Sequence, residues 1–182
     1  MNNDNEKIIL SRDCEATLIP FGNSFTLKKG DEVKITQALG GSFTVMARGS
    51  LFRIEAKDAD SIGKNVVKIS KDESKITGHA TEEEIWEVLK TCYDPEIPVN
   101  MVDLGLIYSC ELINEKPSGT NIEIKMTLTA PGCGMGPMLV DEVKAKVKGV
   151  KNVKDVNVEL VWEPQWNQDM MSESAKLDTG MY

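Results

Sequence analysis

The sequence predicts an α+β protein. It favours a small β-rich unit with a linker over residues 1–79, then a two-layer α/β domain over residues 80–182 in the order helix, β-hairpin, helix, strand. Short apolar runs separated by turn residues predict the first part. Two stretches with helical spacing and three alternating stretches predict the second. Helices on one face of a small mixed or antiparallel sheet would bury both apolar helical stripes.

The amino-terminal unit is predicted from its strands and turns. Residues from about 14 to 70 contain the strand-like runs ATLIP, SFTL, VKIT, SFTVMA and LFRIEA, with turn sequences such as KKGDE and ALGG between them. The polar run KDESKITG, residues 71–78, predicts a linker. His79 follows it and is interpreted as an exposed or capping residue rather than a metal ligand.

The first helix of the second domain begins with a capping signal. Thr81 can accept a hydrogen bond from the first turn, and Glu84 three residues later completes a capping box. An apolar face follows, made of Ile85, Val88, Leu89 and Cys92. Two prolines then prevent a longer helix, so the sequence predicts an ordered loop over residues 94–104.

A hairpin, a second helix and a last strand complete the prediction. Two strands, residues 105–113 and 120–129, flank the turn sequence EKPSG. The next helix is predicted from apolar residues that recur every four positions, namely Met135, Leu139, Val143 and Val147. The last strand is marked by Val156, Val158, Leu160 and Trp162, and a tail, residues 163–182, follows it.

Composition excludes several classes of function. Among 182 residues, 29 are acidic and 21 basic, giving a formal net charge of −8, so general binding to nucleic acid phosphates lacks an electrostatic basis. No stretch approaches the roughly 20 apolar residues of a membrane span, and the polar start lacks the layout of a signal peptide. We therefore expect a cytoplasmic protein that does not bind membranes.

The four cysteines are far apart and form no CxxC pair, and the chain has a single histidine. A self-contained four-thiolate cluster or zinc site is thus poorly supported. Structural disulfides are also a weak interpretation in a reducing compartment. Cys92 and Cys110 each have a place in an apolar pattern and are expected in the core, whereas the sequence indicates neither a partner nor burial for Cys14.

Cys133 has different surroundings. It lies in TAPGCGMGP, a strand-to-helix turn whose glycines and prolines leave little side-chain bulk around the thiol. At a helix N-terminus, unpaired N–H groups and the helix dipole favour an anion such as a thiolate. A thiolate binds iron or attacks an electrophile. The alternative is that the glycines only allow the chain to turn and that Cys133 fills space.

The segment DPEIPVNMVDLG forms an acidic cluster with Asp94, Glu96, Asn100 and Asp103. Its carboxylates could converge on a metal or a partner. Capping, Asx turns and ordinary solvation are the alternative roles of such residues.

Two motifs together resemble a known family. DPEIPVNMVDLGLIY at 94–108 and MTLTAPGCGMG at 126–136 are similar to the small PaaD-like domain of iron-sulfur assembly factors. The runs ITQALGGSFTV at 35–45 and MSESAKLDTG at 171–180 resemble the SufT subgroup. Many relatives have proline after the cysteine, whereas this chain has Gly134. The chain also lacks a P-loop, so no nucleotide is expected.

The resemblance implies an accessory, non-enzymatic role in supplying or maturing iron-sulfur clusters. It implies that Cys133 is the functional thiol and metal ligand, and that Glu96, Asp103 and Thr129 belong to the same site. A transient iron-sulfur cluster or iron would be handled there. The expected partners are the iron-sulfur assembly machinery and client apoproteins, and a small homo-oligomer could supply missing ligands.

Two other functions remain open. The first is a metal-free adaptor that links the assembly machinery to clients, with Trp162 and Trp166 as a contact site or as residues that simply pack on the sheet. The second is a thiol enzyme with Cys133 as nucleophile, for which His79 is the only histidine available as a base.

Overall fold

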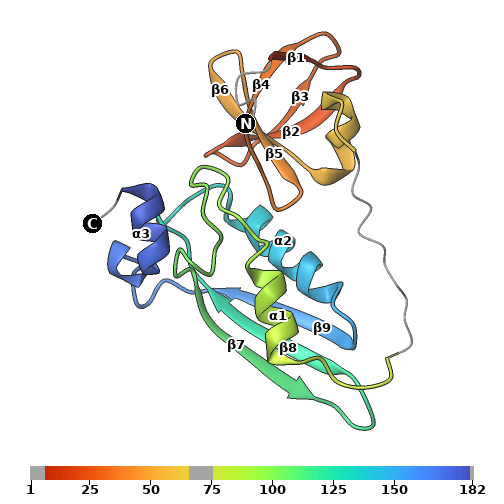
Figure 1. Cartoon of the computed structure of the whole chain (residues 1–182), viewed down its shortest axis with the longest axis vertical. Helices are drawn as coiled ribbons and strands as arrows, with labels where there is room; N and C mark the ends of the chain where they lie inside the picture. The colour runs from red at the N-terminus through yellow and green to blue at the C-terminus, as the bar shows by residue number, and fades with distance from the viewer. Residues whose placement is uncertain (1–6, 66–75, 181–182) are drawn as a thin grey trace. The chain divides into compact units, whose positions relative to one another are not determined.

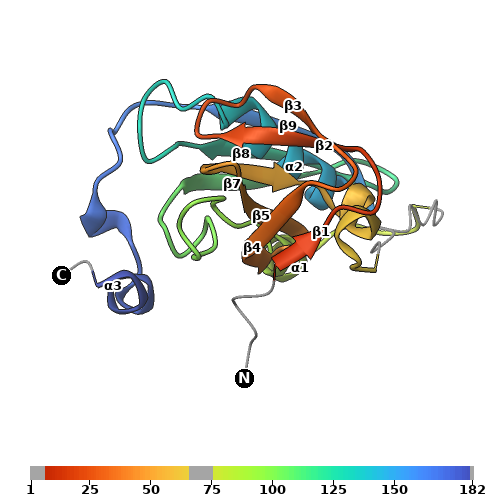
Figure 2. The same cartoon turned by 90° about the horizontal axis from the view of Figure 1, so that it is seen from above.

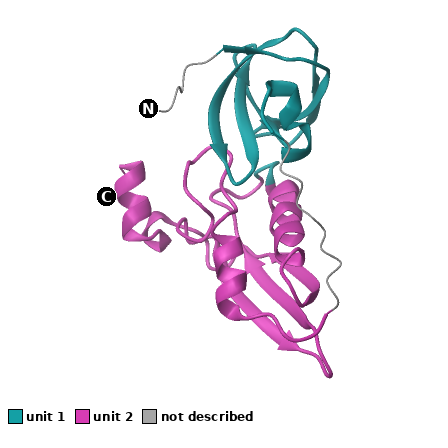
Figure 3. Ribbon diagram, turned by 45° about the vertical axis from the view of Figure 1, so that its right-hand side comes forward, with its two compact units in different colours: residues 1–68, 133–135 teal, residues 69–132, 136–182 magenta. Residues whose placement is uncertain are grey.

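The chain folds into two compact units (Figure 3). Unit 1 comprises residues 1–68 with 133–135, and unit 2 comprises residues 69–132 with 136–182. The computed structural model describes residues 7–65 and 76–180. Most of the predicted linker, residues 71–75, lies outside the described residues, and the predicted domain boundary after residue 79 stays a prediction.

Unit 1 is a six-stranded antiparallel sheet with the strand order β1-β4-β5-β6-β2-β3 (Figure 1, and Figure 2 from above). Its strands are β1 (Lys7–Ile9), β2 (Cys14–Ile19), β3 (Ser24–Leu27), β4 (Glu32–Leu39), β5 (Ser42–Ala47) and β6 (Ser50–Ile54). A 3₁₀ segment, η1 (Ala56–Ile62), follows the last strand. The β-rich character of this part is confirmed, whereas β1 and η1 were not predicted.

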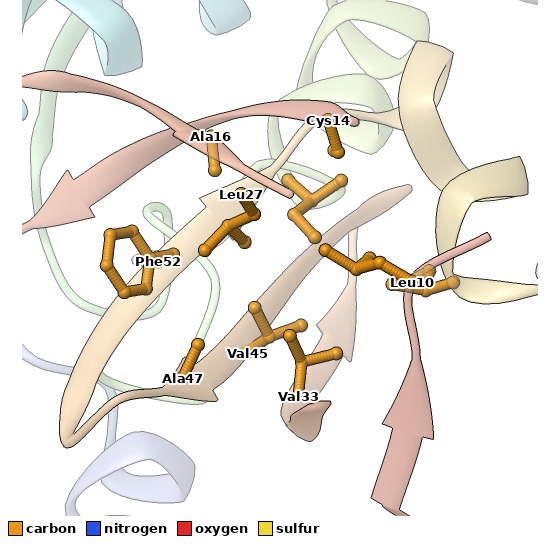
Figure 4. Close-up of a cluster of buried hydrophobic side chains, with 10 residues drawn as sticks. Leu10, Cys14, Ala16, Leu27, Val33, Val45, Ala47 and Phe52 are labelled. Atoms are coloured by element: carbon orange, nitrogen blue, oxygen red, sulfur yellow. The ribbon is translucent and has the colours of Figure 1, made fainter. Parts of the chain in front are cut away.

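The core of unit 1 is a cluster of buried apolar side chains (Figure 4). Its buried residues are Leu10, Cys14, Ala16, Leu27, Val33, Val45, Ala47, Phe52, Ile54 and Ile62. Cys14 is 1% exposed, and burial raises the pKa of its thiol. The sequence had indicated neither a partner nor burial for this residue. Cys14 is therefore a core residue that stays protonated at neutral pH.

The main body of unit 2 is built from two helices and a mixed three-stranded sheet. The helices are α1 (Glu82–Leu89) and α2 (Gly136–Lys148), and the strands are β7 (Ile107–Asn114), β8 (Thr120–Met126) and β9 (Val153–Leu160). β8 lies in the centre, antiparallel to β7 and parallel to β9. Both helices lie on the same face of the sheet (Figure 1). The predicted α+β class and layer order are confirmed.

The sequence patterns of unit 2 place its core correctly. Thr81 and Glu84 form the predicted capping box. The helical and strand stripes are buried, with exposures of 0–1% for Ile85, Leu89, Ile122, Ile124, Met126, Leu139, Val143 and Val147. The opposite face of the sheet is polar and includes Glu111, Glu123 and Lys125. Helix packing on one face thus leaves the other exposed to solvent.

Several predicted boundaries were wrong. Helix α1 ends at Leu89, so Cys92 is buried in the turn after the helix rather than on its face. Strand β7 begins two residues later and β8 ends three residues earlier than predicted, and Trp162 lies beyond β9 and is 42% exposed. The tail, for which no element was predicted, contains η2 (Gln168–Met170) and α3 (Glu173–Thr179).

The segment just before α1 is held by several hydrogen bonds, three of which involve the side chain of Asn152. The Asn152 Oδ1 accepts hydrogen bonds from the N–H groups of Thr77 and Gly78, and its Nδ2 donates to the His79 carbonyl. His79 is exposed, and its Nε2 lies 2.9 Å from the Glu115 carbonyl oxygen. The predicted interpretation of His79 as a surface residue is therefore confirmed.

Candidate functional site

The β8–α2 connection carries Cys133 on an exposed tip. Leu128, before the tip, is 5% exposed, and Ala130, Pro131 and Gly132 are exposed. Cys133 itself is partly buried and its thiol is free. The helix starts at Gly136, where an added Cβ would lie 2.9 Å from the Leu128 Cδ1. Close packing at the helix start therefore anchors the end of a connection whose middle is accessible.

The acidic loop, residues 94–104, is held in shape by the carboxylate of Asp94. Its Oδ1 accepts hydrogen bonds from the N–H of Glu96 at 2.8 Å and of Ile97 at 2.9 Å, which forms an Asx turn. Partial burial of the Glu96 carboxyl raises its pKa, and the negative charge of Asp94, which is 9% exposed, raises it further. The Glu96 carboxyl therefore takes up a proton more readily than an ordinary surface glutamate.

A reciprocal pair of hydrogen bonds fixes Asp103. The Asn100 Nδ2 donates to the Asp103 Oδ2 at 2.6 Å, and the Asp103 N–H donates to the Asn100 Oδ1 at 2.9 Å. The Leu104 N–H then donates to the Asn100 carbonyl. This arrangement resembles a helix cap without a helix behind it. It holds one carboxylate oxygen of Asp103 in a defined direction.

The carboxyl-terminal segment, residues 162–180, packs on the end of the acidic loop. The Trp166 Nε1 donates to the Leu104 carbonyl at 2.8 Å, and the Ser172 N–H donates to the Asp103 carbonyl at 2.8 Å. Gly105 has a φ of 71°, and an added Cβ would lie 2.2 Å from the Met170 carbonyl oxygen. Backbone therefore contacts backbone at this point, which only glycine allows.

The same segment is also held by a hydrogen bond to strand β7 and by two buried side chains. The Tyr108 hydroxyl donates to the Pro164 carbonyl at 2.7 Å. Met171 and Ala175 are 4% and 1% exposed, so η2 and α3 are packed rather than free. Of the two alternatives for Trp166, a partner contact or packing, the hydrogen bond to Leu104 supports packing.

A small open pocket of about 140 Å³ lies between the acidic loop and α3. Its lining includes Tyr93, Asn100, Asp103, Ser174 and Asp178. All its polar side chains can offer oxygen atoms, and two of them are carboxylates. The wall of this pocket therefore carries two carboxylates, those of Asp103 and Asp178.

The structure distributes the four predicted site residues over two loops. Glu96 and Asp103 lie on the acidic loop but have separate anchors, Asp94 and Asn100. Thr129 and Cys133 lie on the β8–α2 connection. In the part of the chain that the structure describes, no three His, Cys, Asp or Glu side chains gather in a way that could hold a metal ion. Convergence of the four residues on one cluster stays a prediction.

Besides Cys133, the other cysteine that is not fully buried is Cys110, on β7. It pairs with Ile124 and points to the helix side of the sheet. Burial raises the pKa of its thiol to about 11, and the charge of Glu82 contributes. Cys110 is consequently a protonated, structural thiol, in agreement with the expectation from its apolar pattern.

Two supports of the acidic loop were only partly indicated by the sequence. Capping was one of the alternative roles expected for the acidic cluster, and the Asn100–Asp103 pair fills it, but the sequence did not indicate which residues would pair. The packing of Trp166 and Ser172 on the loop joins residues more than 60 positions apart. The local signal that the sequence offers here is Ser172, whose side chain caps α3 by accepting a hydrogen bond from the Ala175 N–H.

The chain contains a small α+β domain with two loops of interest, the β8–α2 connection, which carries the partly exposed thiol of Cys133, and the acidic loop. The family model described as iron-sulfur cluster assembly protein matches residues 82–160, which include both loops. The chain is 48% identical over 100 residues to a Fe-S protein maturation auxiliary factor of Porphyromonas gingivalis, covering 55% of this chain and 91% of the relative.

Two further relatives agree with this match. The Fe-S protein maturation auxiliary factor YitW of Bacillus subtilis is 39% identical, with 56% of this chain and 96% of the relative covered. The factor SufT of Staphylococcus aureus is 40% identical, with 48% and 96% covered. The chain belongs to the iron-sulfur cluster assembly protein family. None of its described helices has the length and apolar character required to cross a membrane.

Proposed function

We propose that this protein is an accessory, non-enzymatic factor in iron-sulfur cluster assembly or in the maturation of iron-sulfur proteins. The proposal rests on how much of each relative the alignment with this chain covers. More than nine-tenths of each of three relatives named as Fe-S protein maturation auxiliary factors aligns with this chain at 39–48% identity. The matched family region contains both the acidic loop and Cys133. We infer from the same relatives that the protein acts in the cytoplasm with the assembly machinery and client apoproteins.

In the proposed mechanism, Cys133 donates one thiolate to iron or to a cluster that is cargo rather than a resident cofactor. A single thiolate leaves other coordination positions open, and a client protein, another subunit or a small thiol would fill them. Partial exposure on a connection of small residues supports this role, because an incoming client must reach the same metal. No nucleotide takes part in this hand-over.

The acidic loop would shape the cleft that receives the cargo. Asp103 is held by Asn100 and supported from behind by the carboxyl-terminal segment, so its free oxygen has a fixed direction. Glu96, whose pKa is raised, could exchange a proton as ligands are released. Thr129 would contribute a hydroxyl from the connection that also carries the thiol.

Anaerobic reconstitution tests the role of Cys133 directly. Wild-type protein, Cys133→Ser and the matched control Cys110→Ser are incubated with ferrous iron and sulfide, and visible absorption and bound iron per chain are measured. We expect a chromophore in wild type and in Cys110→Ser and a loss of at least about tenfold in Cys133→Ser, because a serine hydroxyl replaces the only thiol of the proposed site. Equal iron in all three proteins would contradict a cluster on Cys133.

The alternative is a metal-free adaptor, and one observation favours it specifically. The relatives align with only about half of this chain, so the chain holds a large additional part that iron handling by the common domain does not require. Native mass spectrometry distinguishes the two functions. A stoichiometric complex with a client apoprotein that forms equally well without iron would support the adaptor.

A thiol enzyme has less support from the structure. The Nε2 of His79, the only histidine, already contacts the Glu115 carbonyl on the β7–β8 turn. If His79→Ala retains full activity in maturing a client enzyme, general-base catalysis by this residue is excluded.

A further inference from the structure

We propose that β7 is a docking edge for a second copy of this chain, which adds its own β7 in antiparallel orientation with Leu112 opposite Leu112. This surface lies on the sheet of unit 2, and the inference does not depend on the proposed iron chemistry. The pairing would join the two sheets into one continuous sheet across a twofold axis.

The outer edge of β7 has free backbone groups. Within the described residues, β7 is the end strand of its sheet and pairs only with β8. The Glu115 N–H donates to the Gly119 carbonyl in the hairpin turn, and the register runs without interruption from Ser109 to Asn114. Since bonding direction alternates along a strand, odd-numbered residues bond to β8. The N–H and C=O groups of Cys110, Leu112 and Asn114 therefore point outward.

The opposite edge of the sheet is protected against pairing, and β7 is not. Strand β9 carries three charged side chains, Lys154, Asp155 and Glu159, whereas β7 carries only Glu111. Charged residues on edge strands are a common device that prevents edge-to-edge association. Ile113 on β7 is 49% exposed, and Leu112 is only partly buried at the margin of the core. This difference identifies β7 as the edge that accepts a partner.

The side chains select one register for a second copy. Because only even-numbered residues offer outward groups, the twofold axis can lie at Cys110, at Glu111, at Leu112 or at Ile113. An axis at Ile113 pairs only Leu112 with Asn114 and leaves Cys110 without a strand residue opposite it, so its ladder is shorter than the one centred on Leu112. An axis at Glu111 puts two like charges directly opposite each other, beside Glu123 on β8. An axis at Cys110 places the irregular pairing between Ile107 and Ser109 inside the new ladder.

The axis at Leu112 avoids these problems. Cys110 then pairs with Asn114 of the second copy, and each such pair, like the central leucines, exchanges two backbone hydrogen bonds. The two Leu112 side chains extend the helix-side core, and Ile113 lies opposite Glu111 of the second copy on the polar face. Because β7 is complementary to a second β7 in this register, we choose a second copy of the chain rather than a client peptide as the occupant of the edge. Pairing also uses up both open edges and leaves only the charged β9 edges exposed.

The position opposite Glu111 gives a test that reads the register. Ile113→Lys and Ile113→Glu differ only in charge at an exposed site, so neither should disturb the fold. With the axis at Leu112, lysine faces Glu111 twice and strengthens the dimer, and glutamate faces it twice and weakens the dimer. Sedimentation velocity over a concentration series of the full chain should give dimer Kd values on the order of tenfold apart.

A compensating change completes the test. Adding Glu111→Lys to Ile113→Glu restores opposite charges in this register and should return the Kd to near the wild-type value. Tryptophan fluorescence melts confirm that each variant is folded, because all three tryptophans, Trp86, Trp162 and Trp166, lie in unit 2. The proposal is overturned if wild type is monomeric throughout, as client-peptide docking would give, or if the lysine and glutamate variants have the same Kd.

Discussion

The two loops of the candidate site are held in different ways. The acidic loop is fixed by side-chain hydrogen bonds at Asp94 and Asn100 and by backbone contacts with the carboxyl-terminal segment. The connection that carries Cys133 is anchored by close packing where α2 begins and has exposed residues in its middle. The comparison indicates a rigid acidic loop and a less restrained connection for the thiol, a difference that would suit receipt and release of the proposed cargo.

The largest effect is expected for Gly105→Ala in the rigid loop. The new Cβ would lie 2.2 Å from the Met170 carbonyl oxygen, at a φ of 71° that alanine disfavours. The free energy of unfolding of unit 2 should fall by about 3 kcal/mol, the sum of backbone strain and overpacking. Urea denaturation followed by tryptophan fluorescence reports unit 2 selectively. A loss below about 1 kcal/mol would mean that the tail does not pack on the loop.

Gly132→Ala is the matched change on the thiol connection. Gly132 has a similar φ of 79°, but an added Cβ meets nothing within 4 Å. Only the backbone term remains, so we expect a loss of about 1 kcal/mol in the same urea experiment. Equal losses for the two glycine variants would remove the difference between the loops.

Trp166→Phe tests the support that the tail gives to the acidic loop. Phenylalanine keeps most of the apolar volume but removes the hydrogen bond to the Leu104 carbonyl, which should cost about 1 kcal/mol. Hydrogen exchange should become faster at the Leu104 and Ser172 amides, both of which lie in this contact. Unchanged exchange there, with a folded unit 2, would show that the indole bond does not hold the loop.

The smallest effect concerns pH and Glu96. Burial and Asp94 raise the pKa of Glu96 in the folded state, so the folded protein binds more protons than the unfolded chain near and above the ordinary glutamate pKa. Glu96 therefore favours folding at low pH, and this contribution is lost as pH rises through the folded pKa. Glu96→Gln should flatten this part of the stability curve by a few tenths of a kcal/mol, since the group is largely exposed. An unchanged slope from pH 4 to 7 would contradict the assignment.

The framework of unit 2 was predictable because its signals are local. The capping box at Thr81, the four-residue stripe of α2 and the alternation in β8 each lie within one element, and burial followed them. The tail helix α3 was missed because a seven-residue helix with one buried residue, Ala175, has almost no periodic pattern. Its stability comes from tertiary packing, which propensity does not show.

The candidate residues were also visible from the sequence, but their supports were not. Cys133 and the acidic residues stand out through unusual neighbours and through a family resemblance. What orients Asp103 is the Asn100 amide and the backbone of Ser172, and neither is chemically unusual in the sequence. Whether Glu96, Asp103, Thr129 and Cys133 act together stays a prediction, which the reconstitution experiment addresses first for the thiol.

The contact between Gly105 and Met170 also restricts how such a chain can evolve. A lineage that acquires the tail can keep its docking only while position 105 remains glycine, although the two residues are separated by more than 60 positions. A lineage that loses the tail is freed from the steric requirement and retains only the preference set by the backbone angle. Residue 105 would then drift toward asparagine or aspartate, the residues that tolerate a positive φ best.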